Sequence, residues 1–473
     1  MTIKKITDEL KKKTNNAPDI KYKEFVINKN KVTFVYSMSV ASSTSINDFI
    51  LRRLDEEKGK IKDDDIYEYI KNFIPNNNII PFNKKEDILY YVNSGFTVAI
   101  FEDKRFLAFE NRANIFSSIN KSENERSLKG PSDAFSENYQ FNTGMIRRRL
   151  KTEKLWIDEK TIGEESKTKV AMFYIKDLAD DKVVKNIDQK LNNIKIPYVG
   201  NTNYILDAIS NSNRSIFPTN LVTERSDLAC QMLLKGRVIL MVENSNEVII
   251  LPCAFMDFLK NPDDYYEKSL NVIASRIIRV IALILALLTP AVYISLMSYN
   301  LEAIPSGLLI NFSVQRDGVP FSTVFEILVM SMMFQILRES DLRFPGKGGS
   351  SISIVGALVL GQAAVEAGIV SPITIIIVGI SSVASLAFSS IELINSIRWW
   401  QLILILLASV FGIFGVMIGT IIILALLAGE TSCGRPYLFP FEPFNKNAQK
   451  DAIIITNNAK YKMDKGDKDE KNN

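Results

Sequence analysis

Histidine is absent from this chain of 473 residues. That absence excludes the Ser-His-Asp triad, the H-E-x-x-H zinc site and every imidazole proton relay. Cysteine is scarce too: Cys230, Cys253 and Cys433 are widely spaced and form no C-x-x-C pair, so neither a disulfide framework nor a thiolate zinc site is indicated. The net charge of +4 is too small to indicate nucleic acid as a partner. We therefore expect that this chain is not an enzyme and that it has no cofactor and no metal site.

Charge is scarce in one third of the chain. Residues 271–430 hold 7 Lys or Arg and 8 Asp or Glu, out of 110 charged residues in all. We interpret 271–430 as a transmembrane domain with four to six membrane segments, followed by a polar cytoplasmic tail, 431–473, whose end is disordered. The N-terminal stretch "MTIKKITDELKKK" lacks the apolar core of a signal peptide, so we expect the first 270 residues to stay on the cytoplasmic side.

The apolar stretches of this domain are long enough to cross a bilayer, which takes about 20 helical residues. Four of them are predicted as spans, and a fifth is amphipathic, with Glu326 and Gln335 among its apolar residues. Small residues four positions apart predict close helix packing: Gly415 with Gly419 in one span, and Ala357 with Gly361 and Ala364 with Gly368 in another. The four spans and the fifth stretch are Ile277–Met297, Ser351–Val370, Ile373–Ser389, Trp400–Ala428 and Pro320–Leu337.

The number of crossings stays open at this level. A soluble domain and a Lys-rich tail on the same side require an even number. Four full spans satisfy this if Pro320–Leu337 is interfacial, re-entrant or packed inside an oligomer. Six crossings satisfy it if Trp400–Ala428, which has 29 residues, is split at its glycines.

The soluble part shows an internal duplication. The run Val32–Tyr36 resembles Val170–Tyr174, and "GFTVAIFEDKRFLAF" from Gly95 resembles "GRVILMVENSNEVII" from Gly236. The offsets, 63 and 66 residues, nearly agree. In each of the two segments that begin at Gly95 and Gly236, two β-rich runs flank a polar turn, which predicts a hairpin. We predict two related α/β lobes, whose cleft is a common place for a ligand, or which only dock against partners.

We assign 1–129 to the first α/β lobe, 130–160 to a helical linker and 161–270 to the second lobe. The linker carries three consecutive arginines, Arg147 to Arg149. Because acidic residues follow closely, we interpret them as a solvated helix face and not as a phosphate site. The fold class predicted is thus an α/β soluble domain of two related lobes followed by an α-helical polytopic membrane domain.

Several motifs resemble the A subunits of GerA-type spore germinant receptors. These are "GVPFSTVFEILVMSMMFQILRES" followed by "SISIVGALVLGQAAVEAGIVSP", with "GPSDAFSENYQFNTGMIRRRLK", "TERSDLACQMLLKGRVILMVE" and "PDDYYEKS" upstream and "PYLFPFEPF" downstream. The match runs from Gly130 to Phe444 in the family's order. Ser322 and Ser331 depart from it, since the family often has proline and a carboxylate at these two positions.

The resemblance implies a multi-pass protein of the spore inner membrane, with its N-terminal domain facing the core or cytoplasm. It implies assembly with a transporter-like, nutrient-binding B subunit and a lipoprotein C subunit. It also implies that A subunits form a homo-oligomer that conducts monovalent cations. The family includes SpoVAF-like paralogues that work beside the receptors, and the sequence does not separate the two kinds.

Gln362 and Glu366 lie one turn apart on one helical face, which Leu358 and Val355 continue. Such a face could line a pore, where carboxylates select cations and apolar residues close the path. The alternative is that the polar pair hydrogen-bonds between packed helices. A second hypothesis is a scaffold that holds the B subunit and clusters receptors; a secondary transporter is disfavoured because no clear inverted repeat is present.

The junction "PDDYYEKSLNVIASRIIR", Pro262 to Arg279, would connect the lobes to the membrane helices. It could transmit a partner's state between the two domains. Tyr265, Tyr266, Arg276 and Arg279 are also ordinary anchors at a membrane interface, and we favour that interpretation.

Overall fold

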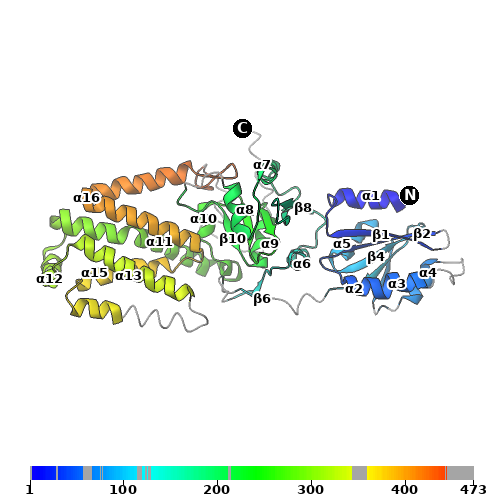
Figure 1. Ribbon diagram of the computed structural model, residues 1–473, viewed down its shortest axis with the longest axis horizontal. Helices are drawn as coiled ribbons and strands as arrows, with labels where there is room; N and C mark the ends of the chain where they lie inside the picture. Colours follow the sequence, from blue (N-terminus) through cyan, green and yellow to red (C-terminus); the bar gives the residue numbers. More distant parts are fainter. Residues whose placement is uncertain are drawn as a thin grey trace.

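The computed structural model describes residues 3–27, 30–56, 66–74, 76, 78–113, 120–122, 125, 129–210, 215–343, 359–442 and 444. The two lobes lie toward one end of an elongated molecule and the apolar helices toward the other (Figure 1).

The first lobe is built on a five-stranded antiparallel sheet in the order β1-β2-β4-β5-β3. Alternate strand residues enter two cores, as period-2 patterning requires. Val98 packs with helices α1 and α5, whereas Ala99 packs on the opposite face with α3 and α4. The elements are α1 (Ile3–Lys13), β1 (Ile20–Ile27), β2 (Asn30–Ser37), α2 (Ser43–Ser45), the π-helix η1 (Ile46–Leu51), α3 (Arg52–Glu56), α4 (Ile66–Phe73), β3 (Ile79–Phe82), η2 (Lys85–Asp87), α5 (Ile88–Asn93), β4 (Phe96–Ile100) and β5 (Phe106–Glu110).

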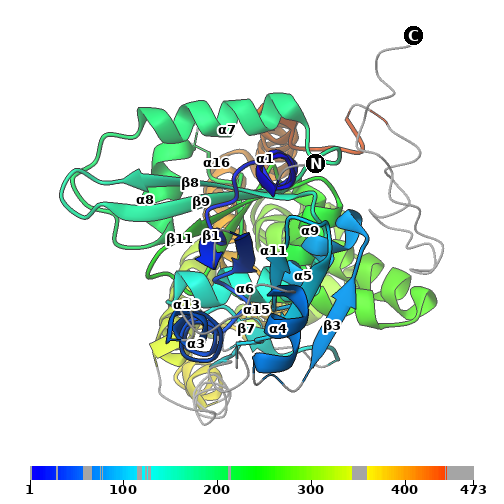
Figure 2. The same cartoon turned by 90° about the vertical axis from the view of Figure 1, so that its right-hand side faces the viewer.

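The second lobe repeats this topology. Its antiparallel sheet has the order β8-β9-β11-β12-β10, which matches the first sheet strand for strand in chain order. Figure 2 shows α7 lying across one face of this sheet. Strand β6 (Asn120–Lys121) precedes the linker, which contains β7 (Asp133–Ala134) and α6 (Tyr139–Arg149). The elements that follow are β8 (Leu155–Ile162), β9 (Thr168–Ile175), α7 (Asp181–Asn193), α8 (Thr202–Ile209), β10 (Leu221–Thr223), α9 (Ser226–Leu234), β11 (Val238–Val242), β12 (Val248–Leu251), α10 (Phe255–Phe258) and η4 (Pro262–Tyr266).

Equivalent details recur in the two lobes and support the predicted duplication. Gly95 and Gly236, which precede β4 and β11, both have positive φ, 87° and 76°. The backbone N–H of Lys31 donates to Glu102 Oε1 at 3.4 Å, and that of Lys169 donates to Glu243 Oε2 at 3.1 Å. Strand β8 begins at Leu155, so the second sheet includes the last residues of the segment predicted as the linker 130–160.

The lobes contact each other through a buried ion pair. Arg147 of α6 has no exposed surface and donates to both carboxylate oxygens of Asp19, at 2.6 and 2.8 Å. Asp19 also accepts from Ser37 and Ser39. The prediction of a solvated helix face is therefore wrong for Arg147. Its side chain is buried against a partner that lies 128 residues away in the chain. Arg148 is exposed, as predicted.

The helical domain follows the second lobe and packs as a bundle. Among the residues that the structure describes, two helices, α11 and α16, are long and apolar enough to cross a membrane. The core of the second lobe on its α9 side is continuous with the core between these helices. The elements are α11 (Ser269–Tyr299), η5 (Leu301–Ala303), α12 (Ser306–Arg316), α13 (Thr323–Arg343), a helix at residues 359–366, α15 (Pro372–Ser385), α16 (Ile391–Gly429), β13 (Thr431–Ser432) and β14 (Arg435–Pro436).

Helix α16 is a hairpin of two helical halves (Figure 1). The chain turns at Gly412, whose φ of 58° and ψ of −137° are not helical. Both ends return to one loop of the second lobe: Ser396 donates to the carbonyl of Ile216, and Tyr437, just after the helix, donates to that of Pro218. This arrangement favours the split of 400–428 over a single span.

The two halves approach closely because two glycines face the first half. An added Cβ at Gly415 would clash with the carbonyl of Leu407, and one at Gly419 would clash with the side chain of Leu404. The G-x-x-x-G pair therefore lies inside one helical hairpin and faces its other half. Tyr299, at the end of α11, donates to the carbonyl of Val410 beside the turn.

A proline in α11 connects three helices. Pro290 has no N–H, so the carbonyl of Ala286 lacks its helical partner. Ser381 of α15 and Gln401 of α16 donate to that carbonyl instead, at 2.8 and 3.0 Å. In an apolar bundle a freed carbonyl needs such donors, and these two fix α15 and α16 against the middle of α11.

Candidate functional site in the helical domain

Glu326 of α13 is a fully buried carboxylate inside the apolar bundle. Its Oε2 accepts from the backbone N–H and the hydroxyl of Ser371, both at 2.8 Å, and from the hydroxyl of Thr374 at 2.9 Å. Ser371 is the N-cap of α15. The carboxylate therefore lies at the positive end of that helix dipole, where a negative charge is stabilised.

The other oxygen of Glu326 has no hydrogen bond. Arg316 Nε lies 3.7 Å from Oε1, which is too long for a hydrogen bond but close enough for an ion pair. Oε1, the Nε of Arg316 and the hydroxyl of Tyr293 are all buried without a hydrogen-bond partner. Sequence reasoning identified Glu326 but missed Arg316 and Tyr293, which come from α12 and α11.

Gln362 and Glu366 lie on the exposed side of the helix at 359–366. They bond to each other, Gln362 Nε2 donating to Glu366 Oε1 at 3.0 Å. Gly361, on the other side, faces α15: an added Cβ would lie 3.6 Å from Ile375. Gln362 and Glu366 therefore share one side of the helix, which points away from α15. Val355 and Leu358, predicted to continue it, lie outside the described residues.

Gly368 has a different local role from the packing residue that was predicted. Its φ of 65° is left-handed, and the N–H of Ile369 donates to Ala364 while the N–H of Gly368 donates to Val365. These are the two hydrogen bonds of a Schellman C-cap, so Gly368 ends the helix. Gln335 of α13 is half-buried.

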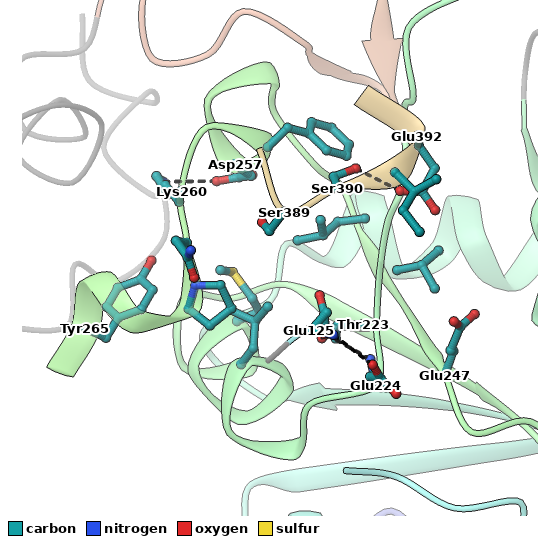
Figure 3. A pocket seen from close by; sticks show the side chains of 18 residues that line it. Glu125, Thr223, Glu224, Glu247, Asp257, Lys260, Tyr265, Ser389, Ser390 and Glu392 are labelled. Carbon is teal, nitrogen blue, oxygen red and sulfur yellow. Dashed lines mark hydrogen bonds and ion pairs between the residues drawn. The ribbon is translucent and has the colours of Figure 1, made fainter. Parts of the chain in front are cut away.

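A pocket of about 80 Å³ lies where the second lobe meets the start of α16. Acidic and hydroxyl side chains converge on it from segments far apart in the chain (Figure 3). Burial raises the pKa of Glu125 to about 7, although Thr223 and the Glu224 amide donate to it. Burial, together with the charges of Glu392 and Glu224, also raises the pKa of Glu247. Sequence reasoning missed this pocket because no local motif marks it.

The junction between the domains is a buried charge cluster. Asp264 of η4 accepts from Arg276 Nε at 3.1 Å and from both terminal nitrogens of Arg279 at 2.8 Å. Asp264 and Arg276 are buried. These arginines of α11 are therefore fastened to the second lobe, and the interpretation as membrane-interface anchors stays a prediction.

Comparison with known proteins identifies the family. The family described as Bacillus/Clostridium GerA spore germination protein matches residues 8–465. Spore germination protein KA of Bacillus subtilis (strain 168) is 38% identical over 337 residues, covering 71% of this chain and 62% of that protein. Spore germination protein GerLA of Bacillus cereus is 29% identical over 458 residues, covering 95% of this chain and 92% of that protein.

The chain is also similar to a second protein of Bacillus subtilis and to one solved structure. The uncharacterized membrane protein YfkQ of Bacillus subtilis (strain 168) is 37% identical, with coverage of 71% of this chain and 66% of that protein. The N-terminal domain of the A subunit of the Bacillus megaterium spore germinant receptor GerK3 is 28% identical, with a TM-score of 0.43, covering 54% of this chain and 96% of that one. This chain thus spans less than two thirds of the length of KA and of YfkQ. From the match over residues 8–465 and the identity to KA, the chain belongs to the GerA family of spore germination proteins.

Proposed function

We propose that this chain is the A subunit of a nutrient germinant receptor in the spore inner membrane. In this role it is a non-enzymatic subunit that works with a transporter-like B subunit and a lipoprotein C subunit. Membership of the GerA family and the similarity to spore germination proteins KA and GerLA support a role in germination. The apolar helices α11 and α16 support a place in the membrane.

The contacts favour six crossings with both ends of the helical domain on the side of the lobes. Helix α11 leaves the second lobe, α13 returns, and the helix at 359–366 leads outward again. Helix α15 returns, because Ser381 lies beside Ala286 and Ser385 beside Arg338. The two halves of α16 make the last two crossings. Helix α13 packs within this bundle, with Ile327 and Met330 in its core, so an interfacial position is the weaker alternative.

The proposed activity is conduction of monovalent cations by a homo-oligomer. The observation that carries it is the Gln362–Glu366 pair, which is exposed on one helical face within an apolar domain. A carboxylate facing lipid is costly, on the order of 2.5 kcal/mol or more at the bilayer centre. A neighbouring copy or a water-filled path removes that cost. Copies arranged around an axis would form a ring of carboxylates that selects cations.

Ion flux in proteoliposomes tests this proposal. The full chain, reconstituted alone, should pass K⁺ or Na⁺, and Glu366→Gln should lower the flux or its cation selectivity by about tenfold, since one ring of charge is lost. Glu339→Gln removes an exposed carboxylate of α13 and serves as the matched control, with flux near that of the parent. Equal flux and selectivity in Glu366→Gln and the parent would remove Glu366 from the path.

A second candidate function is an accessory membrane scaffold, as in SpoVAF-like paralogues. The chain is 37% identical to YfkQ, an uncharacterized membrane protein, and 29% identical to GerLA. The similarity to YfkQ is thus no weaker in identity, which favours keeping the scaffold as a second candidate. The same vesicles discriminate the two, because a scaffold leaves them tight to cations. Co-purification of the B subunit with the chain would then be the expected positive result.

A further inference from the structure

Helix α12 covers the end of the helical domain that lies farthest from the first lobe (Figure 1). It has 11 residues and none of them is buried. Phe312 is partly buried and packs against the bundle core, whereas Ile310 and Val314 are 63% and 70% exposed. A helix that buries so little apolar surface gains little stability from packing. Its position must therefore depend strongly on a few specific contacts.

The two ends of α12 have the features of hinges. Pro305 is the N-cap, and Gly307 lies in the first turn. Gly318 follows the last turn, and an added Cβ at either glycine would meet nothing within 4 Å. The chain at both ends therefore has room to change its backbone angles, which glycine does at low cost.

One charge pair joins the C-terminal end of α12 to the bundle. Arg316 is 24% exposed, and its partner Glu326 is completely buried. The separation of 3.7 Å and the unpaired Oε1 and Nε describe a contact that attracts without a hydrogen bond. Because Oε2 is already held by Ser371 and Thr374, Arg316 can leave while Glu326 stays in place.

The hinge after α12 touches the helix that carries the exposed polar pair. A Cβ at Gly368, two residues beyond Glu366, would lie 3.5 Å from the carbonyl of Gly318. Movement of α12 about Gly318 would therefore shift the end of the helix at 359–366. This contact connects the Arg316–Glu326 pair to the face formed by Gln362 and Glu366.

We propose that α12 is a hinged lid on the end of the bundle, held closed by the Arg316–Glu326 ion pair, whose opening shifts the end of the helix that carries Gln362 and Glu366. The effect of that shift on ion flux rests on the function proposed above, whereas the lid itself does not. Arg316 acts here as a positioning residue: it touches no ion and holds α12 against the buried carboxylate. Loss of either charge removes the attraction and lets α12 open by local unfolding or rotation.

Hydrogen exchange of the full chain in lipid nanodiscs tests the lid. Arg316→Gln should raise the exchange rate of the α12 amides by about fivefold, and Glu326→Gln should do the same, because each removes the same ion pair. The double variant should exchange no faster than either single variant, as expected for two residues of one pair. Arg316→Lys keeps the charge and should restore most of the protection.

Arg338→Gln is the control for this experiment. It removes an arginine that donates to Ser385 Oγ near the other end of α13, so it should leave the exchange rates of α12 unchanged. Glu326→Gln alters a fully buried residue. If the Glu326→Gln protein misfolds, the exchange rates of Arg316→Gln alone test the lid. Parental exchange rates in α12 of a folded Arg316→Gln protein would overturn the lid.

Cation flux in the same vesicles tests whether the shift affects conduction. Arg316→Gln should raise cation flux at least twofold, and Arg316→Gln with Glu366→Gln should lack that gain. Faster α12 exchange without higher flux, where Glu366→Gln does lower flux, would overturn the effect of the shift on conduction. If α12 exchange rises while Glu366→Gln leaves flux at the parental level, the lid stands and the conduction path proposed above is wrong.

Discussion

Asp19 illustrates how this fold holds a buried charge. Burial, the largest influence, raises its pKa, but the charge and hydrogen bonds of Arg147 and the donors Ser37 and Ser39 outweigh it, so the net pKa is lowered. A carboxyl whose folded pKa lies below its unfolded value adds stability above the unfolded pKa and loses it as pH falls through the folded pKa. The contact between the lobes should therefore persist at pH 5 and weaken only in stronger acid.

Arg147→Gln should lower the free energy of unfolding by about 3 kcal/mol at pH 7, because it leaves the Asp19 carboxylate buried without a counter-charge. The deficit should shrink on acidification, since burial alone then raises the pKa of Asp19 and protonation relieves the cost. Urea unfolding of the full chain in detergent, at pH 7 and at lower pH, measures the loss of stability and its change on acidification. The fluorescence of Trp156 reports the unfolding, because its indole N–H donates to the carbonyl of Lys13 across the lobes. For this purpose Trp399 and Trp400 are replaced by phenylalanine.

The control for this experiment is Arg148→Gln, on the exposed side of the same helix. It should change the free energy of unfolding by less than about 0.5 kcal/mol. A loss of the same size in both variants would show that the helix, and not the ion pair, is what the Arg147 substitution disturbs.

At the scale of elements, the turn in α16 converts one long apolar segment into two antiparallel helices. Gly412 adopts backbone angles that are open almost only to glycine. The turn also receives the ring of Tyr299 from α11, so a side chain at position 412 has no room. Backbone freedom at one residue thus decides how many helices cross the domain.

Gly412→Ala should destabilise the chain by about 1–3 kcal/mol from backbone strain alone, and by more because the new Cβ would lie 2.9 Å from Tyr299. Gly379→Ala is the matched control: this glycine lies inside α15, and an added Cβ meets nothing within 4 Å. That change should be neutral or stabilising by up to about 1 kcal/mol. The midpoint of thermal unfolding in detergent measures both, and equal midpoints would contradict the hairpin turn.

At the scale of the whole molecule, the two lobes and the helical domain are joined as one packed body. The buried cluster of Asp264 with Arg276 and Arg279 lies at the joint, and the pocket beside Glu392 lies next to it. A change in the lobes can therefore reach the first turns of α11 through direct contacts.

Asp264→Asn should loosen this joint, because two arginines would then face a neutral amide in a buried place. We expect a loss of about 3 kcal/mol and faster hydrogen exchange at Ser269–Arg279, while exchange around the Gly412 turn stays constant. Asp263→Asn, the adjacent and less buried carboxylate, should have a much smaller effect. Unchanged exchange at the start of α11 in Asp264→Asn would exclude this cluster as the connection.

Features that depend on local patterning could be predicted from the sequence. Strand periodicity and the recurring glycines predicted two related lobes, and the two sheets share one strand order. The scarcity of charge predicted the apolar helices, and the spacing of Gln362 and Glu366 predicted their common face. Each of these follows from neighbours a few residues apart, whose relation is set by helix or strand geometry.

Contacts between groups that are distant in the chain could be identified only from the folded protein. Arg147 is indistinguishable in sequence from Arg148, yet only Arg147 reaches Asp19. Glu326 was noted as a polar residue in an apolar helix, but its partners Ser371, Thr374 and Arg316 come from other helices. The cost of burying a charge or a freed carbonyl is known in advance, whereas the group that offsets it depends on how the elements dock, and local pattern does not encode that docking.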